Sequence, residues 1–481
     1  MKKIFLPFAF LALFAFTGCQ QPEDDGVDYS EEIVEVDEDG GEELPLPGVD
    51  DFGGTTGGEF LDFDSEVGAG ITQNAPKFVS PFVLATINEE ADNTLLAQAQ
   101  QTRARIRRVP VQIPVQQPYI QPEFVGRVPA RLPHQPRLFA NLPDYLHNPD
   151  GLTVSDDQKT VFMCCPNFNG RENNEGPKKN GGFLVSFDIP YRDGTLNKLL
   201  EFPVLEETGQ TGCMGLDFGP DGHLYVCDNQ YFFNKDHKSR VLRVLMDGKK
   251  ATGEVQVVAT GLKLANAIMW MEDKMLVSDT ALDLEGKFGA GGIWSFTKDE
   301  ALEAGTGDNP AIALQPNGTD PRLVIIEEVD DVGRHDGSGV DGITCTPDGT
   351  VYFGNFGDGA MYRAVFENPG KATVEKIHNG GEVFECCDGI FYDKRTDKVY
   401  INDSQANAIR AFKPVNAGEK PNFELIWQNG DTDGAGGLLD QPCECVVIGR
   451  YMIICNFDWP FPGLLNSNFD APYTMSVITL E

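Results

Sequence analysis

The sequence lacks two of the motifs that commonly identify a catalytic centre. No C-x-x-C pair is present, which argues against a zinc ribbon or a thioredoxin-like redox site. No G-x-S-x-G segment is present either, and the six histidines lie singly along the 481 residues. A Ser-His-Asp triad therefore has little support, and any chemistry should rest on other residue types.

Lysine and arginine are absent between residues 23 and 66, a stretch that contains 18 acidic residues. This stretch accounts for half of the formal net charge of -36. Phosphate recognition requires clustered cations, so we do not expect the protein to bind nucleic acid. Residues 20–105 are expected to form an acidic, disordered tether with a short helix near its end, followed by a proline-rich, extended segment over residues 106–137.

The apolar run near the N-terminus, Ile4 to Phe16, follows two lysines and is too short to span a bilayer as a mature helix. The residues that come next, Phe16-Thr17-Gly18-Cys19, resemble a bacterial lipoprotein cleavage box, in which the cysteine is lipidated. We expect residues 1–19 to be a lipoprotein signal peptide, with an ordinary secretory peptide as the alternative. Gln20 favours the outer membrane over the inner one, and without the anchor the protein would be periplasmic or secreted. The lipid on Cys19 is the only membrane attachment that we expect.

Ten cysteines follow Cys19, an even number that is compatible with disulfides in an oxidising compartment. They include the vicinal pairs Cys164-Cys165 and Cys386-Cys387 and the spaced pair Cys443-x-Cys445. Disulfides are the simpler expectation for these thiols, and the sequence leaves their connectivity open. The alternative is a site for a soft metal, formed by Cys213-Met214 together with Cys386-Cys387.

A hairpin pattern recurs along the second part of the chain. In the stretch from Ser338 to Phe356, an acidic residue and a glycine precede a short apolar strand, a Pro-Asp-Gly turn and a second strand of β-formers. Six such units, spaced 47 to 75 residues apart, fit a blade repeat with loop insertions. They begin at Asp150-Gly151, Met214-Gly215, Asn266-Ala267, Asp341-Gly342, Asp388-Gly389 and Glu444-Cys445.

Further strands precede these hairpins and predict how the ring closes. They cover Gln256 to Ala259, Leu323 to Glu327, Val374 to Ile377 and Phe423 to Trp427. The strand from Arg137 to Ala140 has no blade of its own, and the last hairpin with its third strand, Thr474 to Leu480, lacks a fourth. We therefore predict an all-β fold over residues 138–481, a six-bladed β-propeller of four-stranded blades, in which this N-terminal strand completes the last blade and closes the ring.

In this arrangement, the residue at the start of each hairpin points toward the centre of the ring. Five of the six carry a side-chain oxygen, and four of those are acids: the six are Asp150, Met214, Asn266, Asp341, Asp388 and Glu444. Carboxylates crowded around one axis repel one another unless a cation is present, and hard oxygen ligands suit calcium. The alternative is that aspartate and asparagine occur here as turn residues.

Two of these hairpins resemble a known family. Val340-Asp341-Gly342-Ile343 and Ala265-Asn266-Ala267-Ile268, each followed by a turn and a second strand, are similar to the gluconolactonase and senescence-marker-protein (regucalcin) family. More distant similarity extends to the diisopropyl-fluorophosphatases, the paraoxonases and strictosidine synthase. The resemblance covers residues 138–481 by blade pattern, whereas the specific motifs are short.

The resemblance implies a metal site and an activity. Asn266 and Asp341 match two calcium ligands of the family, and Asp150 stands in place of its glutamate. The family's asparagine in the second blade falls at Cys213, whose thiol is a poor calcium ligand. In that family, the residue that matches Asp341 acts as general base or nucleophile, so the resemblance implies a calcium-dependent lactonase or esterase.

Aromatic residues are frequent in the loops expected around the ring centre, where they would suit a small, partly apolar substrate or pack among themselves. They are Phe168, Tyr231, Phe232, Phe233, Phe288, Trp459 and Phe461. His147 and His335 could reach the same face, although loop histidines are the simpler explanation. The competing function is a non-catalytic propeller that binds a ligand or partner at the cell surface, which the cysteine at position 213 favours.

The lipid anchor leads to a first prediction. Cys19→Ala should abolish lipidation and release the protein from membranes, because no other attachment is expected. Fractionation of cells that express either form, followed by washing of the membranes, measures this. A substituted protein that remains with the washed membranes would contradict the lipoprotein interpretation.

Overall fold

The computed structural model describes residues 134–168, 181–189, 191, 196–285, 289–315, 318–329, 338–460 and 465–480. The expected signal peptide with Cys19, the tether and nearly all of the proline-rich segment lie outside these residues, as do Phe288, His335 and Phe461. Among the described residues, no helix is long and apolar enough to cross a membrane.

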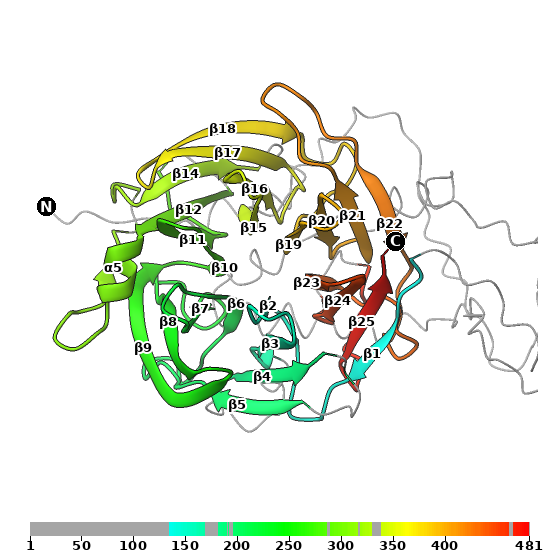
Figure 1. The fold of residues 1–481 in the computed structure, drawn as a ribbon, viewed down its shortest axis with the longest axis horizontal. Helices are drawn as coiled ribbons and strands as arrows, with labels where there is room; N and C mark the ends of the chain where they lie inside the picture. The colour runs from blue at the N-terminus through cyan, green and yellow to red at the C-terminus, as the bar shows by residue number, and fades with distance from the viewer. Residues whose placement is uncertain are drawn as a thin grey trace, which may run out of the picture. The chain divides into compact units, whose positions relative to one another are not determined.

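Six antiparallel sheets lie around a common centre (Figure 1). The first three blades consist of β2 (Leu152–Val154), β3 (Thr160–Cys165), β4 (Phe183–Asp188) and β5 (Asn197–Glu201); β6 (Cys213–Phe218), β7 (Leu224–Asp228), β8 (Ser239–Asp247) and β9 (Lys250–Leu262); and β10 (Ala265–Trp270), β11 (Lys274–Asp279), β12 (Ala290–Thr297) and β14 (Leu323–Glu328). The last three consist of β15 (Val340–Cys345), β16 (Thr350–Asn355), β17 (Met361–Asn368) and β18 (Lys371–His378); β19 (Ile390–Asp393), β20 (Lys398–Asp403), β21 (Ala408–Phe412) and β22 (Glu424–Gln428); and β23 (Pro442–Ile448), β24 (Tyr451–Asn456), β25 (Thr474–Thr479) and β1 (Arg137–Asn141). The predicted six-bladed, all-β propeller is confirmed.

Two small elements add to this ring. The strand β13 (Ile312–Ala313) pairs in parallel with β9, so the second blade has five strands. The helix α5 (Lys298–Glu303) follows β12, and the side chain of Thr297 caps its N-terminus by accepting from the backbone of Glu300.

The second strand of each blade is almost entirely buried, because it lies between two other strands and between two neighbouring blades. In β3, β7, β11 and β16 every residue is buried. These strands are therefore continuous apolar runs rather than alternating patterns. The turn that precedes β16 forms as predicted: the backbone of Thr346 donates to Thr350 O at 2.9 Å, and Gly349 has a φ of +83°.

The ring closes between the two ends of the propeller. The strand β1 pairs with β25 in antiparallel fashion, with Arg137 opposite Val477 and Asn141 opposite Thr474. The Arg137 guanidinium also donates to Thr479 Oγ1 at 2.9 Å. The predicted closure of the last blade by the N-terminal strand is therefore confirmed (Figure 1).

The expectation of disulfides is wrong for the propeller as the structure has it, because all ten of its cysteines are free thiols. The side chains of Cys164 and Cys213 contact each other, as do those of Cys443 and Cys455, but neither pair is bonded. Cys213 lies in the apolar cluster shared with Cys164, whereas Cys387 lies in another cluster, against Gly354. The soft-metal site proposed for Cys213-Met214 with Cys386-Cys387 does not form either, since the described thiols are not brought into one group.

The closing strand can be tested with two matched glycine substitutions. Gly437 and Gly418 have similar positive φ angles, +86° and +81°. A Cβ on Gly437 would lie 1.7 Å from the backbone nitrogen of Leu138 in β1, whereas Gly418 has open space. Gly418→Ala should therefore cost about 1 kcal/mol of backbone strain, and Gly437→Ala clearly more, because β1 must shift. Thermal unfolding of both variants measures this, and equal losses would contradict the closure argument.

Candidate functional site

The centre of the ring contains one small cavity, which the inner strands of several blades approach. Of the six residues at the hairpin starts, five line it: Asp150, Met214, Asn266, Asp341 and Asp388. The cavity measures about 30 Å³, and its wall also includes Phe232, Phe356, Gln441, Cys443 and Phe457. This volume accommodates an ion or a few water molecules, so an organic ligand would have to bind above it.

Irregular strand pairing directs these side chains toward the centre. The register shifts between Ala265 and Ile268 in β10 and between Val340 and Ile343 in β15. Similar shifts occur at the beginning of β6 and β23. Bulges of this kind reorient side chains and are frequent next to functional sites. Here they place Asn266 and Asp341 at the ends of their strands with the side chains facing the cavity.

The glycine that follows a central residue allows neighbouring inner strands to approach closely. A Cβ on Gly151 would lie 2.4 Å from Met214 O, and one on Gly342 would lie 2.3 Å from Asp388 O. Neither glycine has a positive φ. The recurring acid-glycine pair therefore reflects packing between blades rather than turn geometry. Without a positive φ at the glycine, the main argument for interpreting these acids as turn residues no longer applies.

The acids at the centre repel one another. Burial raises the pKa of Asp150 to about 7. Burial, followed by the charges of Asp150 and Glu444, raises the pKa of Asp341, which a hydrogen bond from Asn266 partly offsets. The pKa of Asp388 is raised in the same way, by burial and then by Asp341 and Asp150. Without a cation, the cavity therefore favours protonated carboxyl groups.

One oxygen in this group has no partner. Oδ2 of Asp150 is buried and accepts no hydrogen bond within the described part of the chain. Glu444 does not line the cavity, but its carboxyl lies against Gly389 and is also buried, which raises its pKa. The oxygen donors that do face the cavity are carboxylates and amides, a set that suits a hard cation such as calcium.

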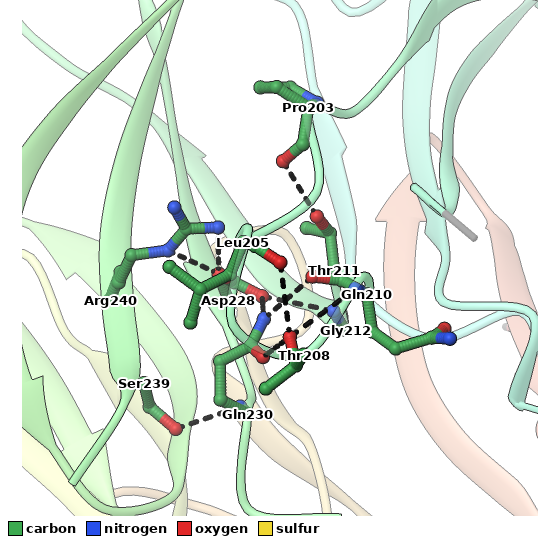
Figure 2. Close-up of polar contacts among 10 residues, drawn as sticks. All are labelled: Pro203, Leu205, Thr208, Gln210, Thr211, Gly212, Asp228, Gln230, Ser239 and Arg240. Carbon is green, nitrogen blue, oxygen red and sulfur yellow. Dashed lines mark hydrogen bonds and ion pairs between the residues drawn. The ribbon is translucent and has the colours of Figure 1, made fainter. Parts of the chain in front are cut away.

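A polar network at the end of β7 fixes the chain that leads to Met214. Asp228 accepts from the backbone of Gly212 at 2.9 Å and from Gln230 Nε2 at 2.7 Å, and it forms an ion pair with Arg240 at 2.6 Å (Figure 2). Because all these groups are buried, their satisfied hydrogen bonds hold the start of β6 in one position.

The same arrangement recurs in other blades. Asp279, the last residue of β11, accepts from the backbone of Lys263 at 3.0 Å and of Leu264 at 2.6 Å. Asn456, the last residue of β24, accepts from the backbone of Asp440 at 3.1 Å. Sequence reasoning missed these supporting residues, although a polar residue ends an apolar run each time.

Besides Glu444, the structure places the sequence-predicted residues Cys213 and His147 away from the cavity. Cys213 is fully buried in the core between the first two blades, where Gly182 leaves room for its sulfur, and Met214 faces the cavity instead. Side chains alternate along a strand, so only one of these neighbours can face the centre. His147 bonds to Asp144 O at 2.7 Å, stacks on Tyr473, and does not line the cavity.

The aromatic residues of the loops form one stacked group beside the cavity. Phe168 contacts Phe232 and Trp459 with ring centroids 5.1 Å and 5.3 Å apart, and Phe457 stacks on Trp459 at 6.1 Å. Phe232 and Phe457 also line the cavity. The group therefore packs internally, as one interpretation expected, and at the same time gives the cavity an apolar wall.

A second group of carboxylates lies outside the cavity, on the sixth blade, and sequence reasoning missed it. It consists of Asp440, Asp458 and Asp470. The signal that could have indicated it is the alternation of Asn429, Asp431 and Asp433 before a glycine, which is typical of calcium-binding loops.

No protein-family model matches the sequence, and no curated protein matches it. Among solved structures, the chain is similar to a periplasmic gluconolactonase from Pseudomonas aeruginosa, with 15% identity and a TM-score of 0.43 over 69% of this chain and 89% of that one. A gluconolactonase from Xanthomonas campestris has 13% identity and a TM-score of 0.39 over 74% of this chain and 99% of its own. The PQQ-bound aldose sugar dehydrogenase from Streptomyces coelicolor has 13% identity and a TM-score of 0.43 over 74% of this chain and 100% of its own. These similarities concern the fold, so the function has to be argued from this chain's own residues.

The opposite directions of the Cys213 and Met214 side chains can be tested by substituting each residue in turn. Met214→Gln keeps the side-chain length and adds an amide oxygen at the cavity, so we expect calcium to raise the melting temperature of this variant by more than that of the unsubstituted protein. Cys213→Asn should instead lower the free energy of unfolding by roughly 1–3 kcal/mol, because it buries an amide without partners. Thermal melts with and without calcium measure both effects. Stronger calcium binding by the Cys213→Asn variant would contradict the placement.

Proposed function

We propose that the protein is an exported, lipid-anchored hydrolase that depends on calcium and acts on a lactone or an ester. The observation that carries the proposal is the buried cavity in which Asp150, Asn266, Asp341 and Asp388 meet around an unpartnered carboxylate oxygen. Such a group of acids is unfavourable unless protons or a cation neutralise it. Export and the anchor rest on the N-terminal segment that ends at Cys19.

The residues present fit a calcium ion. Asp150, Asn266 and Asp341 would hold it, and the carboxylate of Asp388 is available as a further ligand. Calcium prefers oxygen ligands and accepts a mixture of carboxylates and amides. When bound, it would polarise the carbonyl group of a substrate and stabilise the negative charge that develops on its oxygen.

Asp341 is the residue that would accept a proton. Its carboxylate is held by the hydrogen bond from Asn266, and a neighbouring positive charge would lower its raised pKa so that it is ionised at neutral pH. An ionised carboxylate in this place can take a proton from a water molecule as that water attacks the carbonyl carbon. The aromatic wall beside it would hold the partly apolar body of the substrate.

A second candidate function is a propeller that binds a ligand without turnover. The observation in its favour is Met214, which places a thioether rather than an oxygen at the second blade. A thioether is a soft ligand and contributes little to calcium binding. The cation would then stabilise the ring, while the aromatic wall would bind the ligand.

The roles of Asp341 and Asn266 can be separated by kinetics. Asp341→Asn keeps a ligand oxygen but removes the base, so hydrolysis of lactones and aryl esters should fall at least about 100-fold at any calcium concentration. Asn266→Ala should weaken calcium binding, so excess calcium should restore part of its activity. Asp308→Asn, in an exposed turn away from the cavity, is the control for the loss of a charge.

Two outcomes would contradict the proposal. A protein that contains no cation and whose melting temperature calcium does not change would exclude the metal site. Calcium binding by Asp150, Asn266 and Asp341 without turnover of any lactone or ester would exclude the hydrolase and favour the binding propeller.

A further inference from the structure

Three aspartates from separate segments meet on the sixth blade. Asp440 precedes β23, Asp458 follows β24, and Asp470 precedes β25. Each offers one carboxylate oxygen, and these oxygens all lie within 4.8 Å of one another. None of the three lines the central cavity. The group is therefore a second site candidate, built from three loops of a single blade.

The carboxyl groups of this cluster are buried, which is unfavourable unless a proton or a cation neutralises them. Asp440 is 2% exposed and Asp458 is 1% exposed. Oδ1 of Asp440 is buried and has no hydrogen-bond partner among the described residues, and Asp440 is one of the three aspartates whose carboxylate oxygens converge. Asp458 is better satisfied, since it accepts from Asn466 Nδ2 at 3.0 Å and from the backbone of Asp470 at 2.8 Å.

The charges around the group increase the cost of leaving it without a counter-ion. Burial, followed by the charges of Asp458 and Asp470, raises the pKa of Asp440 to about 10. Burial also raises the pKa of Asp458, to about 8. Asp431 and Asp433 add further negative charge to the same region. Within the described residues, no lysine or arginine forms an ion pair with any of the three aspartates.

The chemistry of these donors points to calcium. Oxygens bound to one calcium ion at about 2.3–2.6 Å can be at most about 5.2 Å apart, which the separation of these carboxylates satisfies. No sulfur or imidazole belongs to the group, so a softer metal has no preferred ligand there. Magnesium demands shorter distances and a stricter octahedron, which three carboxylates on separate loops satisfy less readily.

The loop from Asn429 to Asp440 has the residue spacing of a calcium loop, but it is used differently here. The side-chain oxygen of Asn429 accepts from the backbone of Leu439 at 3.0 Å and from Trp427 Nε1 at 3.1 Å, so it closes the loop on itself. The loop therefore does not enclose an ion alone. Its last residue, Asp440, completes a site with the two aspartates of the following loops.

We propose that Asp440, Asp458 and Asp470 bind a second calcium ion, which orders the segment that carries Trp459 beside the central cavity. Trp459 directly follows Asp458, and its backbone donates to the side chain of Gln441, the neighbour of Asp440. Gln441 lines the central cavity. An ion that joins the three aspartates would therefore fix both Gln441 and Trp459, and this inference does not depend on the proposed hydrolase activity.

The test compares the full mature protein, stripped of metal, with Asp440→Asn, Asp470→Asn and a control, Asp308→Asn, which removes an exposed charge elsewhere. Without metal, Asp440→Asn should raise the melting temperature, because it removes the cost of burying or protonating this carboxyl group. With calcium at about 100 times the dissociation constant, the unsubstituted protein should gain several degrees, and both cluster variants should gain less. The sign of the difference between Asp440→Asn and the unsubstituted protein should therefore reverse on addition of calcium.

Stoichiometry and fluorescence separate this site from the central one. Asp440→Asn should lose the calcium ion of the sixth-blade site, and Asn266→Ala should lose the ion of the central cavity at the same calcium concentration. Each single variant should therefore bind one calcium ion fewer per chain, and the double variant two fewer. Calcium should change the tryptophan emission of the unsubstituted protein and of Asn266→Ala. Asp440→Asn and Trp459→Phe should not show this change.

Three results would overturn the proposal. The first is stabilisation by Asp440→Asn with and without calcium, which would mean that the acids share protons. The second is an unchanged calcium content in both cluster variants. The third is an equal response to magnesium, which would overturn the assignment of calcium. The partly exposed Asp470 serves as the second variant if Asp440→Asn folds poorly.

Discussion

The close approach of the inner strands around the centre of the ring is the constraint on which the candidate site depends. Neighbouring strands come so close that a Cβ at Gly151 or Gly342 would collide with the backbone of the next blade. Side chains alternate along a strand, so the residue before each of these glycines faces the cavity instead of the next blade. Crowding of the backbone therefore produces the crowding of charge, and the electrostatic strain at the centre is a consequence of how tightly the blades pack.

The sequence was sufficient to predict the fold because each blade repeats the same local information. The hairpin around Pro347 to Gly349 combines turn chemistry with two β-rich strands, and this pattern recurs in register with the blades. Ring closure was also predictable, because the strand from Arg137 to Ala140 belonged to no blade and the last blade lacked its fourth strand. Both arguments use only counting and short-range geometry, which a single sequence contains.

The site was less accessible to sequence reasoning. The position in the repeat identified Met214 as central, whereas the resemblance to the lactonase family pointed to Cys213, and the structure turns that thiol into the core. The irregular pairing at the start of β6 decides between the two neighbours, and a sequence alone does not show where a bulge lies. The disulfide expectation failed as well, since an even number of thiols does not show that any two of them are bonded.

The aspartates of the sixth blade show even more clearly that a single sequence does not reveal which distant residues meet in the fold. Asp440, Asp458 and Asp470 are separated by whole strands or long loops, and only the folded blade brings them together. The calcium-loop spacing from Asn429 to Asp440 is a local signal for one of the three. The approach of Asp458 and Asp470 to it depends on the three-dimensional path of the chain.

The pairing of β1 with β25 also has a mechanical consequence. Any tension that reaches the propeller through its N-terminal side is carried first by β1, which is attached to the ring by its pairing with β25, by contacts with the loop around Gly437 and by the packing of Phe139 on Phe187. The other blades are continuous in the chain and share no such load. Peeling of β1 would expose the unpaired edge of β25, to which another chain could add a strand. The junction that completes the ring is therefore also the place where a pulling force would open it.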